Sequence, residues 1–101
     1  YLDYASRMST SNFEWNEAKN LENQEKHGVS FEEAQHAFLD QNRVIAEDLE
    51  HSQNEIRYYC FGKDKDGTGI LTVRFTYRAG RIRIIGAGYW RRGKQLYEKS
   101  N

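Results

Sequence analysis

Near its N-terminus the chain carries the pattern of two short helices. A brief apolar alternation at Phe13 and Trp15 leads into Asn16, a residue type suited to cap a helix. Gly28 stands where a helix commonly ends in the left-handed conformation. We therefore expect a first helix between these two signals, with Ala18, Leu21 and Glu25 at helical spacing.

The segment VSFEEAQHAF predicts a second helix directly after this glycine. Ser30 and Glu33 have the spacing of a capping box, and Val29 precedes it in the position from which an apolar residue packs back onto the helix. Phe31, Ala34, Ala37 and Phe38 form an apolar stripe along this helix. His36 lies off the stripe and is expected to face solvent.

The remainder of the chain reads as strands and one closing helix. Turn-forming residues in KDKDGTG separate the second strand from the third. The strand-like segments are residues 43–49, 55–63, 69–78 and 80–88, and the helix is residues 90–99. These elements predict an α+β fold, in which two N-terminal helices pack on an antiparallel sheet of four to five strands and a short helix ends the chain.

The last two strands can be aligned as a hairpin. If Ala79 and Gly80 form a two-residue loop, Arg78 faces Arg81, Thr76 faces Arg83 and Arg74 faces Ile85. The opposite face then pairs Tyr77 with Ile82 and Phe75 with Ile84. A slip by one residue would mix charged and apolar side chains on both faces. The pattern therefore predicts one apolar face, packed on the helices, and one basic face.

The basic face continues into the closing segment. Arg91, Arg92 and Lys94 follow the last strand, and arginine grips phosphate through a planar fork of donors. Tyr89 and Trp90 could stack on unpaired bases, although packing into the core is the alternative for Trp90. The RNA-binding residues expected from this face are Arg74, Arg78, Arg81, Arg91, Arg92 and Lys94.

Charge is distributed unevenly along the chain, although 15 Lys and Arg balance 15 Asp and Glu. Up to residue 73 there are 7 basic and 14 acidic residues, and from residue 74 onward there are 8 basic and 1 acidic. This asymmetry favours a basic working face on an acidic body. The alternative is that the two halves neutralise each other within the fold or across a dimer.

Composition limits the remaining possibilities. We expect residues 1–12 to be a disordered or non-native extension, with Met8 a plausible natural start, and residues 13–101 to form one domain. No run is apolar enough to span a bilayer, and a cytoplasmic protein fits this composition. The single cysteine, Cys60, is expected to be a small buried hydrophobe. No His, Cys or Asp cluster has metal-ligand spacing, so we expect neither a metal nor a cofactor.

Two histidine-containing stretches are candidates for chemistry. Lys26 and His27 stand at the end of the first predicted helix, and His51 lies among Glu47, Asp48, Glu55 and Arg57. RNA can be cut without a metal when its own 2′-hydroxyl attacks the neighbouring phosphate, which requires a base, a cation and an acid. Each stretch also has a purely structural interpretation, because His27 can hydrogen-bond a helix end and His51 can cap a loop.

Several motifs together resemble the BrnT family of bacterial toxins. They are FEWNEAK, KHGVSFEEA, EDLEHSQNEIR followed by FG, and IRII followed by LYE, in that order. The resemblance runs from Phe13 to Glu98. It implies a compact RelE-like ribonuclease fold. It also implies a protein that blocks translation by cutting RNA. It also implies a BrnA-like antitoxin with a ribbon-helix-helix DNA-binding part, so that operator DNA is bound only through the complex.

The resemblance also assigns roles to single residues. Lys26, His27, His51, Arg57, Arg83 and Tyr97 match positions at which the family carries its catalytic groups. One position departs from the family pattern, because Gly88 replaces an arginine expected near the active site. Two hypotheses follow. The chain is either a metal-independent endoribonuclease toxin, or a weakened relative that binds its antitoxin and takes part in operon autoregulation without catalysis.

Overall fold

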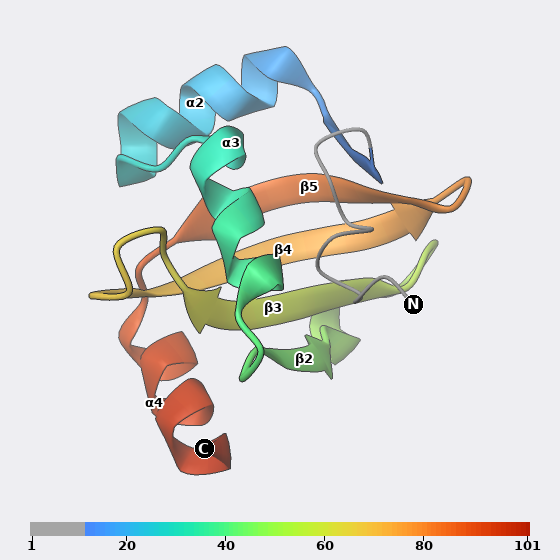
Figure 1. The fold of residues 1–101 in the computed structure, drawn as a ribbon. Coiled ribbons are helices and arrows are strands. Elements are labelled where there is room, and N and C mark those ends of the chain that lie inside the picture. Colours follow the sequence, from blue (N-terminus) through green and yellow to red (C-terminus); the bar gives the residue numbers. More distant parts are fainter. Residues whose placement is uncertain (1–11) are drawn as a thin grey trace, which may run out of the picture.

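The computed structural model describes residues 12–101, so the predicted extension at 1–12 lies almost wholly outside the described residues. A five-stranded sheet has the strand order β1-β5-β4-β3-β2, and helices lie on both of its faces (Figure 1). The elements are β1 (Phe13–Trp15), α2 (Glu17–His27), α3 (Phe31–Ala34), the 3-10 helix η2 (Gln35–Leu39), β2 (Val44–Glu47), the 3-10 helix η3 (Leu49–His51), β3 (Arg57–Lys63), β4 (Ile70–Arg78), β5 (Arg81–Gly88) and α4 (Arg91–Ser100).

The sheet is mixed, which corrects the prediction of an antiparallel sheet. The four longer strands are antiparallel neighbours, as expected, but the short β1 runs parallel to β5. Phe13 pairs with Ile82, near the other end of the chain. Because this pairing joins residues so far apart in sequence, local periodicity gave no sign of it.

The predicted helix signals mark real boundaries. The side chain of Asn16 accepts a hydrogen bond from the backbone N–H of Lys19, and Gly28 ends α2 at φ 69°. Ser30 and Glu33 form the predicted capping box at the start of α3. The second helix is not one α-helix, however, because its winding tightens to a 3-10 helix after Ala34. Capping residues fix where a helix begins but not how it is wound further on.

Helix α2 attaches to the sheet through asparagines. Ala18 and Leu21 are exposed, while Asn20 and Asn23 are buried. The Asn23 amide donates to the backbone oxygens of Val29 and Ala87 at 2.9 Å each. The apolar residues at helical spacing therefore did not predict the buried side of this helix, because hydrogen-bonded asparagine amides are buried there instead.

The hydrophobic core lies between the sheet and the α2–α3–η2 layer. Phe38 is central, with its ring edge-on to Phe13 at 5.3 Å and to Phe75 at 5.0 Å between centroids. Gly62 of β3 approaches the backbone of Ala37 in η2 so closely that a Cβ at this position would overlap the Ala37 carbonyl. The side chains predicted as the apolar stripe of the second helix, Phe31, Ala34, Ala37 and Phe38, are all buried.

The predicted hairpin register is correct near the loop and shifts further along. Arg78 pairs with Arg81, Thr76 with Arg83 and Phe75 with Ile84, as expected. A bulge between Arg74 and Phe75 then places Arg74 opposite Gly86, not opposite Ile85. A bulge adds one residue to one strand, which hydrophobic alternation does not reveal.

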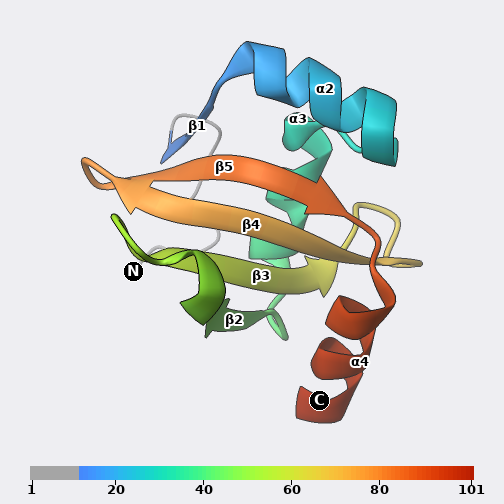
Figure 2. The same cartoon turned by 180° about the vertical axis from the view of Figure 1, so that it is seen from behind.

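The second face of the sheet bears Arg57, Arg74 and Arg83. Helix α4 packs on one end of this face, as Figure 2 shows. Gly93 of α4 lies directly against Thr72 and Phe61, where any side chain would collide. Among residues 12–101 no other α-helix packs on this face. Within the same residues no helix is both long and apolar enough to cross a bilayer.

Candidate active site on the arginine-bearing face

Three arginines from three neighbouring strands share this face. In the sheet register Arg57 of β3 lies opposite Thr76 of β4, which lies opposite Arg83 of β5. Arg74 of β4 occupies the next position on the same face, because residues two apart in a strand point to the same side. The three guanidinium groups of Arg57, Arg74 and Arg83, hereafter the arginine cluster, therefore project from one surface.

Two of these arginines carry donors that no group in residues 12–101 satisfies. The Nε atoms of Arg57 and Arg74 are buried, and neither has a hydrogen-bond partner within the described chain. An unpaired buried donor is costly, so these two atoms are suited to bind an acceptor such as a water or a ligand oxygen. A phosphate oxygen is an acceptor suited to this arrangement, since arginine binds phosphate through parallel N–H donors.

The loop carrying His51 is held against the start of β3. The backbone N–H of Asp48 donates to the Arg57 carbonyl at 2.7 Å, and the hydroxyl of Ser52 donates to the Asp48 carbonyl at 2.6 Å. Ser52 also accepts from the Arg57 N–H at 2.9 Å. These bonds fix His51 beside Arg57.

The imidazole of His51 is oriented by a buried carboxylate. Nδ1 of His51 lies 2.9 Å from Oδ2 of Asp48, whose side chain is 3% exposed, whereas that of His51 is 44% exposed. A carboxylate that accepts from Nδ1 keeps the proton on that nitrogen and leaves Nε2 able to accept another. Such an arrangement suits the imidazole to act as a general base.

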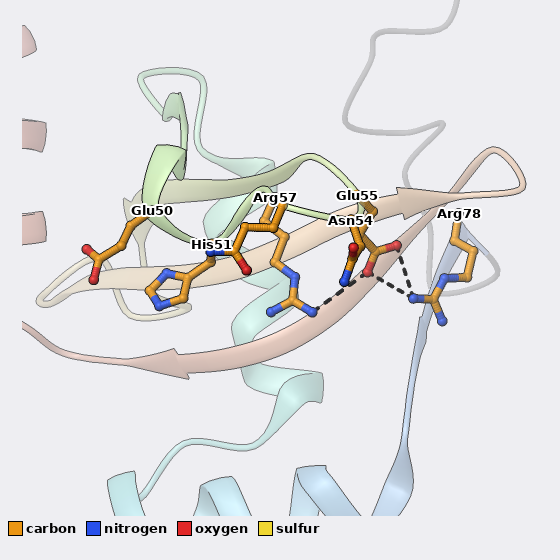
Figure 3. A pocket seen from close by; sticks show the side chains of 7 residues that line it. Glu50, His51, Asn54, Glu55, Arg57 and Arg78 are labelled. Atoms are coloured by element: carbon orange, nitrogen blue, oxygen red, sulfur yellow. Dashed lines mark hydrogen bonds and ion pairs between the residues drawn. The ribbon is translucent and has the colours of Figure 1, made fainter.

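His51 and Arg57 line a polar pocket of about 390 Å³ together with Arg78 and Glu55. In Figure 3 the His51 ring and the Arg57 guanidinium project to the same side of the sheet. Glu55 holds Arg78 at 3.0 Å and lies 3.9 Å from Arg57, so one carboxylate positions two cations. The pocket therefore places a proton acceptor and two positive groups around one space.

Tyr59 joins this site, although the sequence did not single it out. It lies next to Arg74 in the sheet register and near the carboxylate of Asp48. Burial raises the pKa of Tyr59, and the charge of Asp48 adds to this effect. The only sequence signal was its place two residues after Arg57, which puts both side chains on one face.

Arg81 and Arg83 share a carboxylate from the edge strand. Glu14 of β1 lies 3.0 Å from Nη1 of Arg83 and 3.6 Å from Nε of Arg81. Arg81 also donates to the backbone oxygen of Phe13 at 2.8 Å. Glu14 therefore orients these two arginines and lowers the net positive charge at this edge of the arginine-bearing face.

Lys26 and His27 are not brought to the pocket. Lys26 pairs with Glu22 at 3.5 Å, and the His27 ring lies edge-on to Trp90 at 5.1 Å. Trp90 follows the last residue of β5, Gly88, whereas His51 lies beside Arg57 of β3. The two predicted histidine clusters therefore do not meet in one pocket.

Tyr97 is buried in α4 and is bound to Asp40, apart from both histidines. Its hydroxyl donates to Oδ2 of Asp40 at 2.6 Å. Burial, then the hydrogen bond and charge of Asp40, raise the pKa of Tyr97 to about 12. Burial alone would raise the pKa of Asp40, but hydrogen bonds from Tyr97, Lys63 and Asn42 outweigh it and lower that pKa. This geometry suits fixing α4 to the sheet better than proton transfer near neutral pH.

Replacing Tyr97 by phenylalanine is therefore expected to cost stability and to leave any activity intact. Loss of one hydrogen bond to a charged group should lower the free energy of unfolding by about 2 kcal/mol. Because the folded-state pKa of Tyr97 is raised, its contribution is complete below pH 10 and is lost as the pH rises towards about 12. In urea unfolding at several pH values, the free energy of unfolding of Tyr97→Phe should decline less between pH 10 and about 12 than that of the unaltered protein. An equal decline in both proteins would contradict the assigned bond.

The remaining predicted positions lie around α4 and β5. Arg91, Arg92 and Lys94 are exposed on the first turns of α4. At Gly88, a Cβ would lie 2.7 Å from the Trp90 indole, so the indole occupies the space that a side chain at position 88 would need. Cys60 is buried, as predicted, and burial raises the pKa of its thiol. Among residues 12–101 no group of three or more His, Cys, Asp or Glu side chains could hold a metal ion.

Comparison with known proteins agrees with the motifs in the sequence. A family profile described as "Ribonuclease toxin, BrnT, of type II toxin-antitoxin system" matches residues 15–93, which is most of the chain and includes every strand after β1. A search of curated proteins found no match. On the extent of the family match, the chain belongs to the BrnT family of ribonuclease toxins of type II toxin–antitoxin systems.

Proposed function

We propose that this chain is a metal-independent endoribonuclease toxin with a RelE-like fold, and that the arginine-bearing face is its active site. The observation that carries the proposal is the His51–Asp48 pair fixed beside Arg57, on the same face as Arg74 and Arg83. By cutting RNA in the cytoplasm the toxin inhibits translation. A BrnA-like ribbon-helix-helix antitoxin neutralises it and carries the complex to operator DNA.

The proposed reaction uses the 2′-hydroxyl of RNA as nucleophile. Nε2 of His51 removes the hydroxyl proton, the 2′-oxygen bonds to phosphorus, and the bond to the 5′-oxygen breaks. The leaving oxygen takes a proton from water, and the products are a 2′,3′-cyclic phosphate and a 5′-hydroxyl. The arginine cluster binds the phosphate and stabilises the added negative charge as the fifth oxygen bonds.

A cleavage assay tests the enzymatic proposal. The purified chain is incubated with a structured and an unstructured RNA, with and without EDTA. We expect fragments of defined length in both conditions. RNA that stays intact at every protein concentration would remove the enzymatic proposal.

The second candidate is a non-enzymatic antitoxin-binding module that acts in operon autoregulation. Two observations favour it: Gly88 stands where an arginine is expected, and Glu14 lowers the positive charge around Arg81 and Arg83. Expression in a bacterial host separates the candidates. Growth arrest relieved by co-expression of the neighbouring gene indicates a toxin, while unchanged growth supports the binding module.

A further inference from the structure

A second groove opens on the arginine-bearing face, between β3 and α4. It has a volume of about 370 Å³, and its walls include the rings of Tyr59, Phe61 and Trp90 and the side chain of Leu96. We propose that this groove, hereafter the aromatic groove, holds one unpaired base of the RNA strand, stacked on these side chains. The inference rests on the proposed function and adds a base-binding site to it.

The accessible apolar surface of the aromatic groove comes from Tyr59, Trp90 and Leu96, because Phe61 behind them is only 3% exposed. Tyr59 and Phe61 alternate along β3, and their rings lie nearly parallel, with centroids 5.7 Å apart and an interplanar angle of 18°. Trp90 and Leu96 form the opposite side and are each 37% exposed. Aromatic faces of this kind bind bases of any sequence, because every base has a π-face.

Two glycines give the groove its shape before any ligand binds. Gly88 leaves room for the Trp90 indole to lie on the end of β5, and Gly93 lets α4 rest directly on Thr72 and Phe61. The edge-on contact with His27 fixes the indole further. Gly88 thus has a structural role, because any side chain at this position would displace the indole that forms one wall of the groove.

The groove lies next to the proposed active site, because Tyr59 on its wall is two residues from Arg57 on the same face of β3, and this position favours nucleic acid as its occupant. Tyr59 lines the groove and lies close enough to Asp48, which orients His51, for that charge to add to burial in raising the pKa of Tyr59. Arg74 lies beside Tyr59 with its unpaired Nε, and Arg92 stands on the groove wall. A strand whose phosphate lies on the arginine cluster can therefore place a neighbouring base between Tyr59 and Trp90. A purely apolar peptide would leave the buried Nε of Arg74 without an acceptor.

Binding to RNA that cannot be cut tests this inference separately from catalysis. The probe is a short 2′-O-methyl oligoribonucleotide of mixed sequence, and its partner has the same backbone with abasic positions. Trp15→Phe removes the other tryptophan of the chain, so that fluorescence reports Trp90 alone. We expect quenching by the base-containing probe, and binding about 5- to 100-fold tighter than that of the abasic probe.

The variants Trp90→Ala and Leu96→Ala should lower the affinity for the base-containing probe and leave that for the abasic probe unchanged. Trp90→Phe should bind the base-containing probe more tightly than Trp90→Ala does. Circular dichroism melts identify any variant that fails to fold. If Trp90→Ala does not fold, Leu96→Ala still tests the inference. Equal affinity for both probes, or binding without quenching of Trp90, would overturn the inference. Base-dependent binding with no cleavage of unmodified RNA would instead remove the ribonuclease proposal and leave the aromatic groove standing.

Discussion

Replacing His51 by alanine is expected to lower the rate of RNA cleavage by roughly 10²- to 10⁴-fold, the usual contribution of a general base. The imidazole is fixed by Asp48 and adjoins Arg57, so its loss removes the proton acceptor and leaves the phosphate-binding groups in place. His51 is half exposed and lies in a short surface helix, which should keep the change in stability small. Initial rates on a fluorogenic RNA, with folding checked by thermal melts, measure the effect.

Two matched variants make this experiment decisive. His36→Ala removes a histidine on η2, on the other side of the sheet, and should cleave at the normal rate. His27→Ala alters the end of α2 and should have a modest effect, through its contact with Trp90. A loss of activity in His27→Ala together with full activity in His51→Ala would move the general base to α2 and contradict the proposed site.

Replacing Gly62 by alanine is expected to destabilise the fold more than a glycine-to-alanine change at any other position of the sheet. The new Cβ would overlap the backbone carbonyl of Ala37, and backbone atoms cannot rotate away as a side chain does. Overpacking of this kind costs about 3 kcal/mol. For a chain of this size that cost lowers the melting temperature by roughly 12–24 °C.

Gly86→Ala is the control for this prediction. A Cβ at Gly86, in the same sheet, would meet its nearest atom at 3.8 Å, an ordinary contact distance. We expect a melting temperature close to that of the unaltered protein. Similar melting of Gly62→Ala and Gly86→Ala would mean that η2 does not pack on β3 as described.

Local signals predicted the elements well, because the residues that specify them are neighbours in sequence. Asn16, Gly28 and the Ser30–Glu33 capping box each act within one helical turn, and the hairpin loop at Ala79–Gly80 sets the register next to it. The parallel pairing of β1 depends on contacts between distant parts of the chain, and the bulge between Arg74 and Phe75 adds a residue to one strand of the hairpin. No pattern within a single segment specifies either of them.

The candidate site was predictable only in part, for the same reason. Alternation in β4 and β5 placed Arg74 and Arg83 on one face, and the capping of η3 by Asp48 kept His51 near Arg57. The spatial separation of His27 from His51 follows from the sheet order, which the sequence pattern left open. Tyr59 was missed because a tyrosine in a strand is usually a packing residue, and only its neighbours Asp48 and Arg74 distinguish it.

The chemistry of the cut RNA ends tests the central claim most directly. The purified chain is incubated in EDTA with an RNA and with the same sequence fully methylated at the 2′-oxygens, and the products are identified by mass. If His51 and the arginine cluster drive attack by the 2′-hydroxyl, the unmodified RNA yields 2′,3′-cyclic phosphate ends and the methylated RNA stays whole. Cleavage of the methylated RNA, or products that carry 5′-phosphates, would contradict the account.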